Sequence, residues 1–287
     1  MVSGNDAAVA LSEFVAGSIN SFADMMNEKA SNLGLKSTHF ISPHGLDAEE
    51  HYTTAFELAL ITNYALENST FRKIVNTKNY TVTIDDTSKL LNNTNELLGS
   101  LDGIYGVKTG FTNGANRCLV TACKRNDLDI ICVVLGCDTK KDRTLDSIKL
   151  INYAFNNFSV INIKELISKN FVSWVKNNID NFTVNKGLSS DLDLYLDFSK
   201  IPYEKIAINN SLDNPISTNF EVNYNYTAPV FIDNKVGSIA VSYNKNYLFS
   251  VEILTKNTIS RKTVSFYLKT FIKYYFSYLE EQIYRAK

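Results

Sequence analysis

Two short strings, far apart in the chain, constrain its fold more than any other feature of the sequence. Ser3-Gly4-Asn5 opens a helical pattern, and Lys108-Thr109-Gly110 lies in a run that is typical of a turn entering a strand. Ser-x-Asn alone is a weak signal, because residues 18–20 and 217–219 match it as well. Lys-Thr-Gly occurs once and carries more weight. A hydroxyl and an amide at a helix start, with a cationic strand edge, predict one shared cleft.

The composition narrows the class of protein. The chain has 287 residues, enough for two ordinary domains, and its 45% hydrophobic and 21% charged residues are typical of a globular protein. A formal net charge of −1 argues against a nucleic-acid partner. The chain contains no run of about eighteen apolar residues, the length that would predict a membrane-spanning helix.

Three further strings lie in order between the two motifs. They are Asn27-Glu28-Lys29-Ala30, Leu33-Gly34-Leu35 and Pro43-His44-Gly45-Leu46-Asp47. With the two motifs, this ordered set resembles the serine-type D-alanyl-D-alanine carboxypeptidases, which are the low-molecular-mass penicillin-binding proteins. The resemblance is close from Ser3 to about Asn157 and weaker to about residue 255.

The resembling family uses a third signature, S-x-x-K, whose serine is the nucleophile. Only Met1 and Val2 precede Ser3, so this signature has no counterpart upstream of it. Matches at 173–176 and 242–245 follow Lys-Thr-Gly, and about this number is expected by chance. We therefore expect an N-terminally truncated member of the family, without nucleophile or signal peptide, that is inactive alone.

The resemblance implies roles for the catalytic residues that remain. Ser3 would relay a proton toward the departing D-alanine, and Asn5 would position the substrate amide. Lys108 would supply a fixed positive charge for catalysis and substrate binding. These roles correspond to the parts that acyl transfer through serine requires besides the nucleophile.

The same resemblance implies a set of substrate-binding residues. Thr109 would donate a hydrogen bond to the terminal carboxylate, and Arg143 would hold that carboxylate through its guanidinium fork. Gly110 lacks a Cβ, so the substrate could lie along the strand as an added strand. The N–H of Phe111 would be one donor of the oxyanion hole.

Neither a metal nor a cofactor is expected. His39, His44 and His51 lie close together, but no second ligand cluster accompanies them, so a role in loop structure is favoured. The pleat of two consecutive strands places Cys123 and Cys132 on the same face. A disulfide between them is possible, and small buried side chains are the favoured interpretation.

The pattern predicts an α+β fold in three parts. Residues 1–158 would form a penicillin-binding/β-lactamase-like catalytic domain, an antiparallel sheet flanked by helices and incomplete at its N-terminus. Residues 159–257 would form a small all-β domain, and 258–287 an amphipathic helix. The main expected elements are helices 6–16, 18–34, 54–67, 141–158 and 261–286, with strands 80–84, 104–109, 119–124, 128–136, 228–233, 236–243 and 247–254.

The C-terminal helix allows two interpretations. Apolar residues follow helical spacing, aromatic residues crowd the stretch 266–278, and lysines are interspersed. The helix could pack on its own domain, or it could bind a membrane surface with its aromatic residues at headgroup depth. The resemblance favours the membrane surface, and with it an extracytoplasmic, membrane-associated location.

The leading functional hypothesis is a serine-type D-Ala-D-Ala carboxypeptidase of the bacterial cell wall. Its substrates would be peptidoglycan stem peptides, from which it would remove the terminal D-alanine, and β-lactams would acylate the intact enzyme. One alternative is a non-catalytic protein that binds D-Ala-D-Ala peptides. A serine β-lactamase is a third hypothesis, disfavoured by the second domain and the C-terminal helix.

Overall fold

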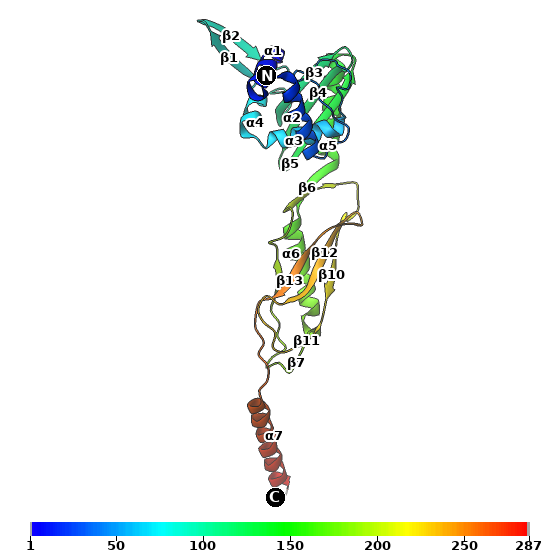
Figure 1. Ribbon diagram of the computed structural model, residues 1–287. Coiled ribbons are helices and arrows are strands. Elements are labelled where there is room, and N and C mark those ends of the chain that lie inside the picture. The colour runs from blue at the N-terminus through cyan, green and yellow to red at the C-terminus, as the bar shows by residue number, and fades with distance from the viewer. Residues whose placement is uncertain (1, 286–287) are drawn as a thin grey trace. The chain divides into compact units, whose positions relative to one another are not determined.

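The computed structural model describes residues 2–285 of the protein, so Met1 and residues 286–287 of the expected ranges lie outside it (Figure 1). The chain divides into two compact units, Met1–Ser159 and Val160–Lys287. Up to the division the elements are α1 (Asn5–Ala16), α2 (Ile19–Asn32), α3 (Ala55–Leu66), α4 (Ser69–Val75), β1 (Asn79–Ile84), β2 (Thr87–Asn92), β3 (Ile104–Thr112), β4 (Asn116–Arg125), β5 (Leu128–Cys137), α5 (Lys140–Asn157) and β6 (Phe158–Asn162), which crosses it.

A three-stranded antiparallel sheet of order β3-β4-β5 is the centre of the first unit. Neighbouring residues of β4 face opposite sides, as the pleat requires. On one face, Cys123 packs in a core cluster with Ile151 of α5. On the other, Ala122 packs in a second cluster with Leu66 of α3 and with Val75, the last residue of α4. The sheet therefore lies between helices, as expected for an α+β catalytic domain.

Local signals predicted the helix starts of this unit well. The Ser18 hydroxyl caps α2 by accepting a hydrogen bond from the N–H of Ser21, and Thr54 caps α3 in the same way from Glu57. The string Thr54-Ala55-Phe56-Glu57 predicts a capping box, and this prediction is wrong in its second half. The Glu57 carboxylate accepts from the N–H groups of Lys36 and Ser37 at 2.9 Å each, so it ties α3 to the loop after α2.

Two further expectations concern side chains near α5. The sequence pattern places Leu145 on the apolar face of this helix with Ile148, Ile151 and Phe155. This is wrong for Leu145, which is 44% exposed, because the core-facing stripe begins one turn later. Cys123 and Cys132 lie in the same core cluster, as the pleat predicted, and both are free thiols. Burial raises the pKa of Cys132 to about 11.

The second unit is built on a four-stranded antiparallel sheet of order β10-β12-β13-β8. Its elements are α6 (Ile163–Asn178), a 3-10 helix (Ile179–Asn181), β7 (Thr183–Asn185), β8 (Leu194–Asp197), β9 (Lys205–Asn209), β10 (Ile216–Val222), β11 (Asn225–Thr227), β12 (Lys235–Tyr243), β13 (Asn246–Thr255) and α7 (Val264–Arg285).

The expectation that this domain is all-β is wrong, because α6 is part of its core. Ile163, Ile167 and Phe171 recur every fourth residue and are buried with sheet residues such as Ile239 and Ile253. The residue before the helix, Asn162, caps it by accepting from the N–H of Glu165. The expected strand at 228–233 is also wrong, since Val230 forms only an isolated bridge with Ile259.

The burial of α6 can be tested by a matched pair of substitutions. Ile167→Ala should lower the free energy of unfolding by about 2–5 kcal/mol, because it removes a fully buried side chain. Val172→Ala on the same helix, where Val172 is 67% exposed, should change it by less than about 0.5 kcal/mol. Urea unfolding measures both values, and equal values would contradict the packing of α6.

Candidate active site

The Lys-Thr-Gly triplet lies on β3, an edge strand of the three-stranded sheet. β4 pairs with one side of β3, with Lys108 opposite Val120 and Gly110 opposite Cys118. An edge strand has a row of backbone groups that can pair with an extended peptide. The expected triplet is therefore on a strand whose position suits peptide binding.

The two sequence motifs meet at one contact. The Lys108 ammonium donates a hydrogen bond to the Ser3 hydroxyl, with 2.6 Å between Nζ and Oγ, and another to the carbonyl of Thr109, also at 2.6 Å. Burial lowers the pKa of Lys108, because desolvation disfavours the charged form. The sequence predicted only that the two motifs share a cleft, and in the structure Ser3 and Lys108 are in direct contact.

Asn5 is the first residue of α1, two positions after Ser3, and its side chain is exposed. Gly4 occupies the N-cap position and has no side chain to cap the helix. The start of α1 therefore places Asn5 on the same short segment as Ser3, which touches β3.

Gly110 and Phe111 follow the lysine toward the end of β3. A Cβ added to Gly110 would meet only the Cβ of Cys118, at 3.7 Å, which is an ordinary contact. Glycine is therefore not needed here by the packing of the protein itself. The Phe111 ring is 53% exposed, and the Arg117 guanidinium stacks over it at 4.2 Å from the ring centroid.

Arg143 is in the first turn of α5 and is only 4% exposed. Its guanidinium lies 3.6 Å from the Glu96 carboxylate, and within the described residues its buried Nε has no hydrogen-bond partner. Close by, the Thr109 hydroxyl donates to the hydroxyl of Thr94 at 2.7 Å. The sequence did not point to Thr94 or Glu96, although both belong to a polar run directly before a buried Leu-Leu pair.

Asp47, the last residue of the loop string Pro43–Asp47, holds the end of β3. The Asp47 carboxylate accepts hydrogen bonds from the Thr112 hydroxyl and from the N–H of Gly114, which lower its pKa. A Cβ on Gly114 would lie 2.9 Å from this carboxylate. Asp47 therefore clamps the β3–β4 turn, a role that sequence reasoning missed.

The three histidines contact their own loop through ring nitrogens. His51 accepts from the N–H of Ile41, His39 pairs with the carbonyl of Glu50, and His44 contacts Ser42. Among residues 2–285 no group of three or more histidine, cysteine or carboxylate side chains could hold a metal ion. Burial lowers the pKa of His51, which suits a neutral acceptor.

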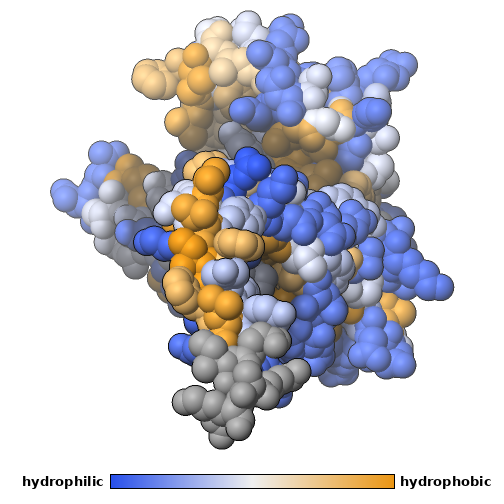
Figure 2. All heavy atoms as spheres, turned by 90° about the horizontal axis from the view of Figure 1, so that it is seen from below, coloured by the Kyte–Doolittle hydropathy of each residue, from blue (hydrophilic) through white to orange (hydrophobic). Residues whose placement is uncertain are grey.

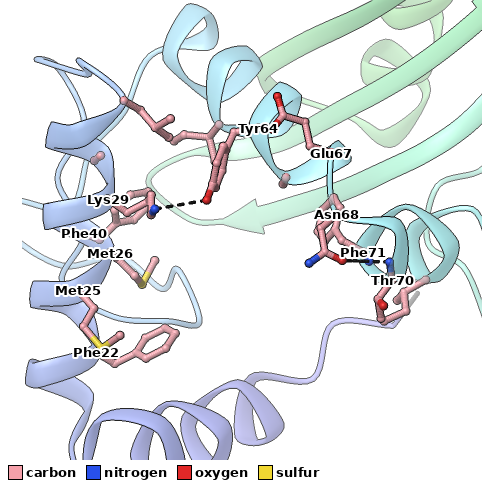
Figure 3. A pocket seen from close by; sticks show the side chains of 15 residues that line it. Phe22, Met25, Met26, Lys29, Phe40, Tyr64, Glu67, Asn68, Thr70 and Phe71 are labelled. Atoms are coloured by element: carbon pink, nitrogen blue, oxygen red, sulfur yellow. Dashed lines mark hydrogen bonds between the residues drawn. The ribbon is translucent and has the colours of Figure 1, made fainter.

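Two hollows flank the helices and the β3–β4 turn. The first, of about 760 Å³, is apolar and lies between α2, α3 and α4, with Phe22, Met26 and Phe71 among its lining residues (Figure 3). At its rim Lys29 donates to the hydroxyl of Tyr64 at 3.3 Å. The second, of about 780 Å³, is lined by Asp47 and the β3–β4 turn. Neither hollow is lined by the Ser3–Lys108 pair.

The fold places the protein in a known structural class. Penicillin binding protein 5 from Haemophilus influenzae has a similar structure, with a TM-score of 0.60 at 25% sequence identity, over 91% of this chain and 72% of that chain. The sheet between helices and the second domain after it are thus those of a penicillin-binding protein.

The sequence comparisons agree with this class. The D-alanyl-D-alanine carboxypeptidase DacF of Bacillus subtilis is 38% identical over 159 residues, 55% of this chain and 41% of the relative. The carboxypeptidase DacD of Escherichia coli K12 is 30% identical over 245 residues, 83% of this chain and 58% of the relative. Residues 1–139, just under half of the chain, match the model of the peptidase S11 family, described as D-alanyl-D-alanine carboxypeptidase. The chain spans about half the length of the curated relatives it matches.

Two glycines, Gly103 in the turn before β3 and Gly110 within β3, distinguish a glycine that the fold requires from one that it does not. Gly110→Ala should leave the free energy of unfolding within about 0.5 kcal/mol of the parent, because the added Cβ meets no close atom. Gly103→Ala should lower it by more than about 1 kcal/mol, because φ is +81° and the Cβ would lie 2.4 Å from the carbonyl oxygen of Lys124. Urea unfolding measures both, and a large loss for Gly110→Ala would mean that the fold itself requires this glycine.

The half-buried ammonium of Lys108 should titrate below the ordinary pKa of a lysine. Because its pKa in the folded state lies below the ordinary 10.5, the unfolded chain binds more protons between these two values. The contribution of Lys108 to the free energy of unfolding therefore rises with pH until about 10.5. NMR of ¹³Cε-labelled lysine should show one signal that titrates below 10.5 and is missing in Lys108→Arg. A Lys108 signal that titrates at 10.5 or above would contradict the desolvation.

Proposed function

We propose that the chain is the substrate-binding part of a serine-type D-Ala-D-Ala carboxypeptidase that acts on peptidoglycan stem peptides. The observation that carries the proposal is the contact between Ser3 and Lys108 at the edge of β3. The match of residues 1–139 to the peptidase S11 family supports the same reaction. The reaction is hydrolysis of the peptide bond between the last two D-alanines through an acyl-serine, and β-lactams would acylate the same serine of the intact enzyme.

Each residue at the contact has a proposed task. Ser3 and the Lys108 ammonium form a short hydrogen-bonded pair, which suits the delivery of a proton to the departing amine of D-alanine. Asn5, two residues after Ser3, would donate a hydrogen bond to the substrate amide or accept one from it. Desolvation makes Lys108 a better proton donor, because it weakens the hold on the proton.

The strand edge has the complementary task of binding. The stem peptide would pair with β3 along Gly110, where no Cβ stands in its way, and the N–H of Phe111 would face the developing oxyanion. Thr109 and Arg143 would bind the terminal carboxylate, for which a hydroxyl and a guanidinium are suitable partners. In the ligand-free protein these two side chains are held by Thr94 and Glu96.

The nucleophile is the part of the reaction that this chain does not supply at the site. Both Ser-x-x-Lys matches lie in the second unit, one at Ser173 on α6 and the other at Ser242 near the end of β12. For the chain as given, this favours binding of D-Ala-D-Ala peptides without catalysis, which is the second candidate function. Neither alternative requires a cofactor.

Covalent and reversible binding can be measured separately. Fluorescent penicillin should leave no label on residues 1–287, whereas N-acetyl-D-Ala-D-Ala should shift NMR signals of β3 in a saturable manner. Lys108→Met should weaken peptide binding about ten-fold or more, because it removes a charged hydrogen-bond donor. Lys89→Met, which changes an exposed lysine of the β1–β2 hairpin, is the matched control and should leave the affinity unchanged.

Two results would contradict these proposals. A covalent penicillin adduct, mapped to a serine by mass spectrometry, would show that the chain carries its own nucleophile. Absence of saturable peptide binding at millimolar concentration would remove the substrate-binding role of β3.

We also propose that α7 binds the surface of a membrane, as would suit an extracytoplasmic, membrane-associated enzyme of the cell wall. Its large apolar side chains are exposed, including Phe271 at 67% and Tyr274 at 72%, and Figure 2 shows hydrophobic residues in a stripe along this helix. Lys269 and Lys273 lie among them, as in helices that bind anionic lipid. Within residues 2–285 no helix has both the length and the apolar character to cross a bilayer.

Flotation of the full chain with vesicles tests the role of α7. The chain should float with phosphatidylglycerol-containing vesicles and less with pure phosphatidylcholine. Phe271→Glu should weaken binding about ten-fold or more, because it removes a large apolar side chain and adds a negative charge. Val172→Glu, at an equally exposed site on α6, is the control and should bind as the parent does. Equal loss in both variants, or no binding by the parent, would contradict the proposal.

A further inference from the structure

Three consecutive side chains connect parts of the candidate site that belong to different elements. Thr94 accepts the hydrogen bond from the Thr109 hydroxyl at 2.7 Å, and Asn95 donates to the carbonyl of Gly106 at 2.8 Å. Glu96 lies 3.6 Å from the guanidinium of Arg143. We call residues 94–96 the bracket.

The bracket is held firmly by its own neighbours in the chain. Asn93 donates to the carbonyls of Val75 and Thr77 at 3.2 and 3.0 Å. Asn95 is 2% exposed and accepts from the N–H of Leu97, which is itself buried in the core cluster of the sheet. The backbone at 94–96 is therefore fixed on both sides and cannot follow a ligand freely.

The two outer side chains of the bracket differ from the middle one. Asn95 is buried and serves the fold, whereas Thr94 is exposed and Glu96 is 53% exposed on its side chain. Their contacts reach Thr109 on β3 and Arg143 on α5, with a further hydrogen bond of 3.2 Å to Glu96 from the hydroxyl of Thr144. Little of their contact is with the core, so a purely structural role does not explain both.

The two outer residues of the bracket lie close together in the chain, and each contacts a different group of the candidate site. Residues two apart in a chain are separated by at most about 7 Å between Cα atoms. One short stretch of chain therefore holds both the Thr109 hydroxyl and the Arg143 guanidinium, although Thr109 and Arg143 belong to different elements. A hydroxyl donor and a guanidinium fork are both suitable partners for a carboxylate.

We propose that Thr94 and Glu96 are positioning residues that hold Thr109 and Arg143 ready for the terminal carboxylate of the substrate. This rests on the proposed function and names the residues that make it selective for a free carboxyl terminus. When the Thr109 hydroxyl donates its hydrogen bond to the ligand carboxylate instead of to Thr94, its oxygen can still accept a hydrogen bond, since a hydroxyl is both donor and acceptor. The Glu96 carboxylate keeps Arg143 oriented by charge until the ligand carboxylate arrives.

The experiment compares two probes that differ only at the carboxyl terminus. N-acetyl-D-Ala-D-Ala and its C-terminal amide are titrated by NMR into the full chain and into the variants Thr94→Val, Thr94→Ser and Glu96→Gln. The parent should prefer the carboxylate. Thr94→Val and Glu96→Gln should reduce that preference about two- to ten-fold, the range for loss of one hydrogen bond. Thr94→Ser keeps the hydroxyl and should restore the parental preference.

A second measurement needs no ligand. Three-bond couplings of the Thr109 side chain should show one χ1 rotamer in the parent and in Thr94→Ser, and rotamer averaging in Thr94→Val. Ser100→Ala, which changes an exposed residue just beyond the bracket, is the control for both measurements and should behave as the parent.

The outcomes separate this inference from the proposed function. If the parent binds neither probe, the proposed function fails, and the Thr109 rotamer alone decides whether the bracket positions it. If the parent prefers the carboxylate while Thr94→Val and Glu96→Gln keep the same ratio, the bracket has no such role. An unchanged single rotamer of Thr109 in Thr94→Val overturns the proposal as well.

Discussion

The candidate site depends on one constraint, which is that β3 is paired with β4 on one side and lies at the edge of its sheet. The antiparallel register with β4 fixes the positions of Lys108 and Gly110 along the strand direction, opposite Val120 and Cys118. Core clusters on both faces of the sheet make that register rigid. The result is a stiff strand with an edge free for an extended peptide, which is the geometry that strand addition requires.

The chemistry of the site follows from the partial burial of one ammonium group. Removal of Lys108 from water disfavours its charge, and hydrogen bonds to the Ser3 hydroxyl and the Thr109 carbonyl partly offset this. The ammonium therefore releases its proton more readily than an exposed lysine while it touches a hydroxyl. Ser3 lies just before α1 and touches the strand, so the proton transfer that we propose for this pair depends on tertiary packing.

Most expectations based on local patterns were confirmed. The caps at Ser18 and Thr54 and the strands of the central sheet follow from residue type and period alone. By contrast, α6 was missed because its pattern stands inside a region rich in short strand-like runs. The Glu57 side chain was assigned to its own helix, but it binds the loop after α2, which no local rule can foresee.

The sequence by itself determined the family resemblance, the α+β class and the residue types at the site, because motifs, caps and periodicity are written locally in the chain. Only the tertiary structure decided that Ser3 touches Lys108, that Arg143 is buried beside Glu96, and that Thr94 contacts Thr109. Each of these contacts joins two segments that are far apart in the chain, and Ser3, Thr94 and Glu96 lie outside helices and strands, where the sequence has no periodic pattern. Their geometry is set by how the sheet and helices pack, and that packing is a property of the whole unit.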